Sequence, residues 1–245
     1  MGKKIKNFWN FTNSSGEAKI LTIQIVVGAI LTLASTFIFA KIADHVVDKE
    51  AILFDSQIIK IVYLFRTPFT TTIMKAFTFF GGEIFLSAAI LITIAAIYKE
   101  HKKDALIFGF ILFFGIILNL MLKDAFQRPR PNFQPLVHET SYSFPSGHSM
   151  NSFIFYTSVS YFIFRKAKNK KVGYFLITIS ILLIGAVGLS RIYLGAHYPS
   201  DVAGGYAAGL IWFAAILVFE KILIVSNMFR KYEIEKGYKI NLYSG

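Results

Sequence analysis

The stretch Ala105–Pro131, with the sequence ALIFGFILFFGIILNLMLKDAFQRPRP, joins a long apolar run to a short basic loop. The apolar part is long enough to cross the hydrocarbon core of a bilayer as a helix, which requires roughly 20 apolar residues. The loop that follows holds Lys123, Arg128 and Arg130. Because charged side chains are costly inside a bilayer, the end of this run is predicted to lie at a membrane surface.

The rest of the chain has the same apolar character. Over 245 residues the hydrophobic fraction is 55%, and the mean hydropathy of +0.55 is typical of a protein with several spans. We predict an all-α polytopic fold with about six transmembrane helices, at 20–40, 84–98, 105–122, 149–164, 172–189 and 202–225. The segment Ile52 to Phe80 mixes apolar and charged residues, so we expect an interfacial helix there, followed by the start of the second span.

We interpret residues 1–245 as a single membrane-embedded domain. Residues 1–19 are expected to form a cytoplasmic N-terminus, 20–225 the transmembrane core and 226–245 a cytoplasmic tail. The first span follows a polar segment and is long for a cleaved signal peptide, so we expect it to remain as an anchor.

Basic clusters predict which side of the membrane each loop faces. They lie before the first predicted span and after the second, fourth and sixth. With six spans all these clusters fall on one side, which the positive-inside rule assigns to the cytoplasm. The loops that hold the motifs then face the outside of the cytoplasmic membrane. This distribution explains the net charge of +12 without a nucleic-acid partner, which we do not expect.

The loop after Leu122 places two cations at the predicted outer surface. Pro129 and Pro131 restrict the backbone of Arg130, so its guanidinium is presented from a stiff loop, which suits the binding of a phosphate. Basic side chains at the end of a span also reach towards lipid headgroups, and Lys123 alone fits that interpretation as well. The sequence gives no role to Arg128, which is equally compatible with a spare surface charge.

The sequence Pro145-Ser146-Gly147-His148 stands immediately before the fourth predicted span. The free amide groups and the dipole at a helix N-terminus favour an anion, and Gly147 lets the backbone approach a ligand closely. Ser146 taken alone is explained equally well as a helix cap. Capping does not explain a histidine at this boundary, so His148 is a candidate site residue.

The stretch Ser190–Asp201, SRIYLGAHYPSD, joins the fifth and sixth predicted spans. Asp201 is suited to cap the next helix, but it also stands four residues after His197 and can fold back onto it. A carboxylate at one imidazole nitrogen fixes the tautomer and leaves the other nitrogen nucleophilic. Two histidines on one membrane face, surrounded by arginines, therefore indicate phosphoryl chemistry.

Metal and thiolate chemistry have no pattern to support them. The chain contains no cysteine, and its His, Asp and Glu residues do not cluster at the spacings of metal ligands. We expect neither a metal nor a cofactor. Glu83, at the start of the second predicted span, fits a site residue or an acid favoured by the helix dipole.

These motifs closely resemble those of the type 2 phosphatidic acid phosphatase family, which shares its site with glucose-6-phosphatase and the vanadium haloperoxidases. The family pattern is Lys, six residues, Arg-Pro; then Pro-Ser-Gly-His; then Ser-Arg, five residues, His, three residues, Asp. The chain matches it in order at 123–131, 145–148 and 190–201. The segment from Asp55 through Arg66 to Thr78 and Gly81 is more loosely similar to the entry region of the family.

The resemblance implies a role for each matching residue. His197 would attack phosphorus, Asp201 would orient it, and His148 would protonate the leaving oxygen. The phosphate-binding set would comprise Lys123, Arg130, Ser146, Gly147, Ser190 and Arg191. Three fixed cations would then replace the magnesium that is usual in phosphoryl transfer.

We therefore expect a bacterial integral membrane enzyme, a metal-independent phosphatase of lipid phosphates or diphosphates that works through a phosphohistidine. Undecaprenyl diphosphate, phosphatidylglycerophosphate and phosphatidic acid are the candidate substrates. The alternatives are a phosphotransferase with an acceptor other than water, a lipid-phosphate transporter without turnover, and a vanadate-dependent haloperoxidase, which the membrane spans count against. Neither the lipid nor the oligomeric state follows from the sequence.

Overall fold

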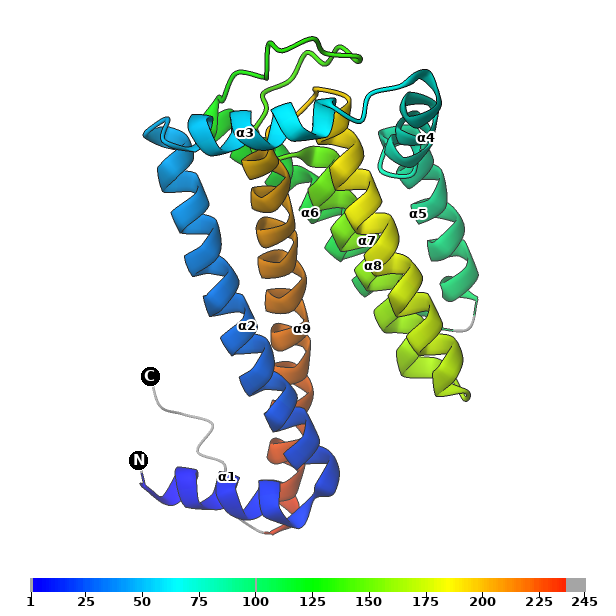
Figure 1. The fold of residues 1–245 in the computed structure, drawn as a ribbon. Helices are drawn as coiled ribbons and strands as arrows, with labels where there is room; N and C mark the ends of the chain where they lie inside the picture. The colour runs from blue at the N-terminus through cyan, green and yellow to red at the C-terminus, as the bar shows by residue number, and fades with distance from the viewer. Residues whose placement is uncertain (1, 100, 237–245) are drawn as a thin grey trace. The chain divides into compact units, whose positions relative to one another are not determined.

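The computed structural model describes residues 2–99 and 101–236, which form helices joined by loops (Figure 1). The helices are α1 (Gly2–Ser14), α2 (Gly16–Val47), α3 (Ala51–Tyr63), α4 (Pro68–Phe79), α5 (Glu83–Tyr98), α6 (Lys102–Phe126), α7 (Gly147–Lys166), α8 (Lys170–Tyr193) and α9 (Pro199–Glu235). The predicted all-α class is confirmed.

Several of these helices are suited to cross a membrane. Among the described residues, α2, α6, α8 and α9 are each long and apolar enough. The pair α4 and α5, bent by 42°, passes the same test as one unit, which gives up to five spans. With 16 residues, α5 alone falls short of the length for a span. The chain is therefore a multi-pass membrane protein, and the number six stays a prediction.

Because α4 forms one span-like unit with α5, the predicted interfacial helix followed by the start of the second span fits the two helices found in this segment, α3 and α4. Thr67 separates them, because its hydroxyl accepts a hydrogen bond from the Thr70 amide at 3.1 Å and starts α4. In return the Thr70 hydroxyl accepts one from the Thr67 amide at 2.9 Å, which completes a capping box. Pro68 then occupies the first turn, where its missing N–H has no consequence. In Figure 1, α3 lies crosswise to α7 and α8.

Contacts within the chain define two compact units, one of residues 35–213 and one of residues 1–34 and 214–245. Among its described residues, the second unit has a small apolar core of Phe11, Ala18 and Val225, against which Phe8 and Phe229 pack. The predicted cytoplasmic tail, 226–245, falls partly outside the described residues, because 237–245 are not among them.

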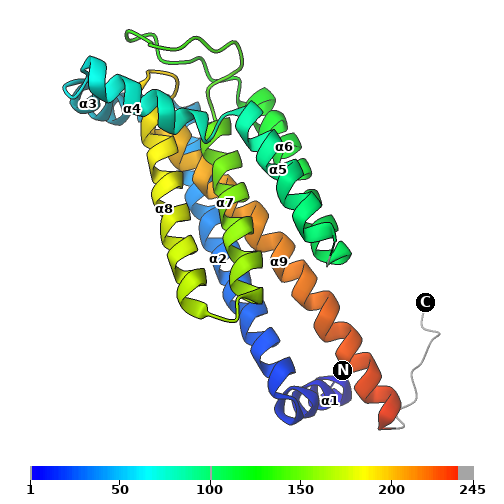
Figure 2. The ribbon, with the colours of Figure 1, turned by 90° about the vertical axis from the view of Figure 1, so that its right-hand side faces the viewer.

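In the unit of residues 35–213, α7 packs against α5, α6 and α8 and lies between α8 and the α5–α6 pair in Figure 2. The end of α6, the start of α7 and the end of α8 lie together at the end of the unit that carries the loop 127–146 (Figures 1 and 2). These are the places where the three sequence motifs stand. The turn between α7 and α8 lies at the opposite end (Figure 1). Helix packing therefore gathers the motifs at one end.

Candidate active site

A cavity of about 270 Å³ lies where the three motifs meet. Its polar wall contains Lys123, Arg130, Gly147, His148 and His197. The cavity is also lined by apolar side chains of α5, α6 and α7, which are Leu86, Ile90, Leu112, Ile116, Leu120 and Ile154. The site thus combines cationic and histidine side chains with apolar ones.

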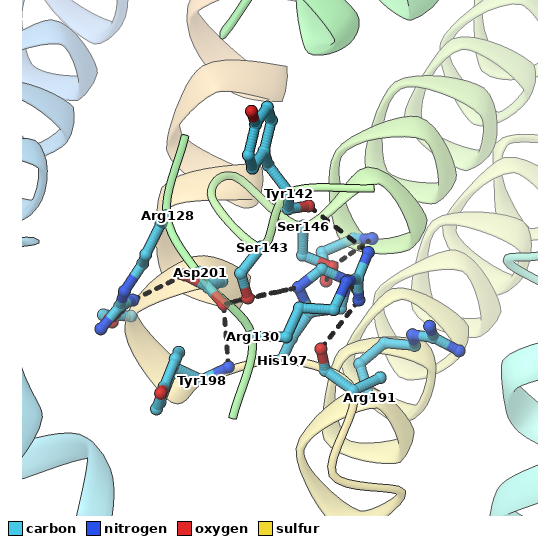
Figure 3. Close-up of polar contacts among 12 residues, drawn as sticks. Arg128, Arg130, Tyr142, Ser143, Ser146, Arg191, His197, Tyr198 and Asp201 are labelled. Atoms are coloured by element: carbon cyan, nitrogen blue, oxygen red, sulfur yellow. Dashed lines mark hydrogen bonds and ion pairs between the residues drawn. The ribbon is translucent and has the colours of Figure 1, made fainter. Parts of the chain in front are cut away.

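His197 lies almost fully buried in the loop between α8 and α9, and its two ring nitrogens contact different partners (Figure 3). Its Nε2 is 3.2 Å from Arg130 Nη1. Because an arginine N–H can only donate, this contact requires a lone pair on Nε2. The ring proton then sits on Nδ1, which is 3.4 Å from Asp201 Oδ2 and 3.4 Å from Ser143 Oγ. This tautomer leaves Nε2 unprotonated, so its lone pair can attack an electrophile that takes the place of the contact with Arg130.

The protonation state of His197 suits the same role. Burial lowers its pKa to about 4, even though the hydrogen bond and the charge of Asp201 act in the opposite direction. The charges of Arg130 and Arg191 contribute to the same lowering of the pKa. The imidazole is therefore neutral at neutral pH and does not need to lose a proton before it attacks an electrophile.

Asp201 is fully buried, and both of its carboxylate oxygens have hydrogen-bond donors. Oδ2 accepts a hydrogen bond from the Tyr198 amide at 2.9 Å and another from the Ser143 hydroxyl. Oδ1 accepts one from Arg128 Nη1 at 2.6 Å. Sequence reasoning missed Ser143, because nothing in its local sequence sets it apart from the other serines of this loop.

Two of the predicted cations are held in place by the loop that closes the site. Lys123 Nζ donates to the Tyr142 carbonyl at 2.6 Å and to the Ser141 hydroxyl at 3.0 Å. Arg130 Nε donates to the Ser141 carbonyl at 2.7 Å, and Nη1 donates to the Ala196 carbonyl at 2.8 Å. Both positive charges are therefore fixed at the cavity wall before any ligand arrives.

Arg191 projects from the last turn of α8 and is buried. Its Nη1 donates to Thr78 Oγ1 at 2.7 Å, its Nη2 forms an ion pair with Glu139, and its buried Nε has no hydrogen-bond partner in the structure. Glu139, which also lines the cavity, was not predicted. Burial alone would raise the pKa of its carboxyl group, but Arg191 and then Arg130 outweigh burial and lower it.

His148 lies in the first turn of α7 and lines the cavity together with His197. Ser146 is the N-cap, because its hydroxyl accepts from the Ser149 amide at 3.4 Å and from the Ser149 hydroxyl at 3.0 Å. The Ser146 amide donates to the Asp201 carbonyl at 3.0 Å, which ties the start of α7 to α9. Ser190 donates to the Val187 carbonyl of its own helix at 2.6 Å. The hydroxyl groups of Ser146 and Ser190 are hydrogen-bonded to neighbouring residues of α7 and α8 in this structure. A role of these serines in binding phosphate stays a prediction.

Gly147 makes the polar wall possible by its size. A Cβ atom there would lie 2.9 Å from Asn119 Oδ1 on α6, which is closer than ordinary van der Waals contact. A side chain at this position would push against Asn119, so its absence lets the start of α7 pack closely against the end of α6, next to Lys123.

Arg128 is not the spare surface charge that the sequence allowed. Its side chain is only 8% exposed and forms ion pairs with Asp55 on α3 and Asp201 on α9. Each partner is 73 positions away in the chain, so no local pattern could have indicated either contact.

A metal site is not evident from the protein ligands. Within residues 2–99 and 101–236, no group of three or more His, Cys, Asp or Glu side chains is placed to hold a metal ion. Metal independence therefore stays a proposal about the reaction.

Comparison with known proteins assigns this chain to a family. Residues 104–223 match the model of the PAP2 superfamily. Phosphatidylglycerophosphatase B of Bacillus subtilis (strain 168) is 37% identical over 195 residues, which cover 76% of this chain and 94% of that protein. The chain belongs to the PAP2 superfamily.

Other PAP2 proteins support the same fold and class. The crystal structure of a transmembrane PAP2 type phosphatidylglycerolphosphate phosphatase from Bacillus subtilis has a TM-score of 0.74 at 32% identity, covering 78% of this chain and 96% of that one. Undecaprenyl-diphosphatase BcrC of the same species is 27% identical over 117 residues, covering 46% of this chain and 55% of that protein. These relatives are lipid phosphatases by name, which supports a phosphatase of membrane lipids here.

Proposed function

We propose that this PAP2 protein hydrolyses the terminal phosphate of a lipid phosphate or diphosphate, with phosphatidylglycerophosphate as the first candidate substrate. The observation that carries the proposal is that one cavity is lined by two histidines, two fixed cations and several apolar side chains. A phosphate at the polar wall leaves the adjoining part of the lipid against the apolar side chains. The names of the relatives, a phosphatidylglycerophosphatase and a phosphatidylglycerolphosphate phosphatase, support this choice of substrate.

In the first chemical step, His197 Nε2 attacks phosphorus. The Nε2–P bond forms while the bond between phosphorus and the lipid oxygen breaks, and His148, which takes up a proton when the anionic phosphate enters beside it, gives that proton to the oxygen. The imidazole gains positive charge in this step. Its Nδ1–H faces Asp201 and Ser143, so the carboxylate stabilises the charge as it develops.

The phosphoryl oxygens gain charge and shift position during the same step. Lys123 and Arg130 face them from the cavity wall, and Arg191 reaches them when Glu139 gives way. Removing one such preorganised donor costs about 2.7–4 kcal/mol in comparable anion-stabilising sites. This cationic set is why we propose that the reaction proceeds without a metal ion.

In the second step, water attacks the phosphohistidine. His148, deprotonated by the first step, accepts a proton from the water as the new P–O bond forms and the N–P bond breaks. Phosphate leaves, and both histidines return to their starting states. A phosphotransferase would use another acceptor at this stage. Adding glycerol as a competing acceptor to the reaction would reveal such transfer.

We further propose that residues 1–245 work as one multi-pass protein of the cytoplasmic membrane with the site facing outwards. The basic segment Arg165 to Lys171 comprises the end of α7, the turn and the start of α8, opposite the motif loops, which is the distribution expected from the positive-inside rule. In a chain without cysteine, Asn132→Cys should react with an impermeant thiol reagent in intact cells, and Asn169→Cys should not. The reverse pattern would contradict the outward orientation.

The proposed reaction is tested by phosphate release in detergent from phosphatidylglycerophosphate, phosphatidic acid and undecaprenyl diphosphate, each with excess chelator. Turnover with chelator present is expected, together with a labelled phosphohistidine at His197. A His197→Ala variant is the negative control for phosphate release by contaminating enzymes. Phosphate release that stops with chelator and returns with magnesium would refute metal independence. Transfer to glycerol in preference to water would favour the phosphotransferase.

A further inference from the structure

A buried charge network lies behind the cavity and joins three elements that are far apart in the sequence. Arg128 comes from the loop after α6, Asp55 from α3, and Ser200 and Asp201 from the first turn of α9. Arg128 Nη2 is 2.8 Å from Asp55 Oδ2, and its Nη1 is 2.6 Å from Asp201 Oδ1. Both carboxylates are fully buried.

The network fixes the start of α9 as well as the carboxylate. The Ser200 amide donates to Asp55 Oδ1 at 2.9 Å, and its hydroxyl donates to Asp55 Oδ2 at 2.6 Å. Arg128 Nη1 also donates to the Ser200 hydroxyl at 2.7 Å. The guanidinium lies over the ring of Tyr198, 4.1 Å from its centre. With so many partners Arg128 has little freedom, which favours a single orientation of Asp201.

The charges of this network do not cancel. Two buried carboxylates share one guanidinium, so with all three ionised the group carries one net negative charge. That charge lies next to His197, because the remaining oxygen of Asp201, Oδ2, faces His197 Nδ1. A simple Arg128–Asp201 pair would be neutral and would stabilise an imidazolium much less.

We propose that Asp55 and Arg128 are positioning residues for phosphoryl transfer at His197: Arg128 fixes the Asp201 carboxylate, and Asp55 fixes Arg128 while keeping the network negative. The proposal rests on the function proposed above. Neither Asp55 nor Arg128 is among the residues that line the cavity, so both act through Asp201 and His197.

The charge and the geometry of the network are separated by a matched pair of variants at one position. Asp55→Asn removes the charge, and Asp55→Glu keeps the charge while disturbing the packing. Asp48→Asn, at an exposed position just before α3, is the control for loss of an acid. For Asp55→Asn we expect kcat to fall about 5- to 30-fold, the range for a coupling of this kind, with KM nearly unchanged.

The pH profile gives the decisive readout. Loss of the Asp55 charge makes the surroundings of His197 less negative, so its pKa should fall further and the acid limb of kcat/KM should move to lower pH. Arg130, Arg191, Glu139 and His148 also influence His197 electrostatically, but none of them is changed. Asp55→Glu should leave the limb in its wild-type position, and Arg128→Lys should lower kcat without moving it, because only the planar fork is lost.

The same shift is measured without turnover by NMR of the histidine ring, assigned with His197→Gln. An active wild type with equal limbs for Asp55→Asn and Asp55→Glu, and equal losses of thermal stability, would reduce the network to a purely structural role and overturn the proposal. A wild type that hydrolyses no lipid phosphate would instead refute the proposed function. The change in the pKa of His197 measured by NMR would still decide the positioning role.

Discussion

The ion pair between Glu139 and Arg191 should oppose the binding of phosphate. Glu139 lines the cavity and forms an ion pair with Arg191, whose buried Nε has no hydrogen-bond partner among the described residues. A phosphate that uses Arg191 must first displace this carboxylate or accept its repulsion. Glu139→Gln should therefore strengthen the binding of phosphate and of vanadate.

The size of the effect follows from the burial of the pair. The Arg191 side chain is 2% exposed and the Glu139 side chain 30% exposed, so the pair lies between an exposed and a buried salt bridge. Exposed pairs contribute about 0.2–1 kcal/mol, and close pairs at dry interfaces show couplings of about 1.5–7 kcal/mol. We take about 1–2 kcal/mol for this pair, which corresponds to about 5- to 30-fold tighter binding of the anion.

Inhibition of aryl phosphate hydrolysis by vanadate measures this change, and thermal stabilisation by inorganic phosphate measures it without turnover. Glu83→Gln is the matched control, because it removes another carboxylate from the cavity wall and leaves the Arg191 ion pair intact. Equal or weaker anion binding by Glu139→Gln would show that the carboxylate does not compete with the ligand. Equal gains in both variants would reduce the effect to the overall charge of the cavity.

Three further predictions concern the histidines and the packing of α9. His197→Ala should abolish turnover on every substrate, whereas His148→Ala should lose about 10²–10⁴-fold on a lipid alkyl phosphate and less on an activated aryl phosphate; equal losses on the two substrates would remove the role of His148 as acid. Since burial lowers the pKa of His197 to about 4 and the free imidazole must be neutral to attack, kcat/KM should fall as the pH drops through about 4, and a limb near the ordinary value of 6.5 would contradict the buried neutral state. A Cβ at Gly205 would lie 2.8 Å from the Ser146 carbonyl oxygen, so Gly205→Ala should destabilise the protein by about 1–3 kcal/mol and lower turnover; an unchanged melting temperature in detergent would refute this close packing.

Local patterns predicted most of the helices and the residues that meet at the cavity. The apolar runs led to α2, α5, α6, α7, α8 and α9, and three short motifs led to Lys123, Arg130, His148 and His197. The position of the break at Thr67 was not predicted, because a Thr-Pro cap is a weak signal inside an apolar segment. Asp55, Arg128 and Glu139 could not have been placed, since each depends on a partner that only the tertiary fold brings near.

The anchoring of the cations supports the proposal that this site transfers a phosphoryl group without a metal ion. Lys123 and Arg130 already donate to backbone carbonyls of the loop around Ser141 and Tyr142, so their side chains need little reordering when a phosphate enters. Fixed donors stabilise a charge that develops in the transition state more than donors that must first reorient. The Ser141 hydroxyl accepts from both Lys123 and Arg130, and this shared contact holds two like charges at the same wall. In that arrangement the repulsion between the cations, which folding must overcome, becomes an attraction for any dianion that enters the cavity.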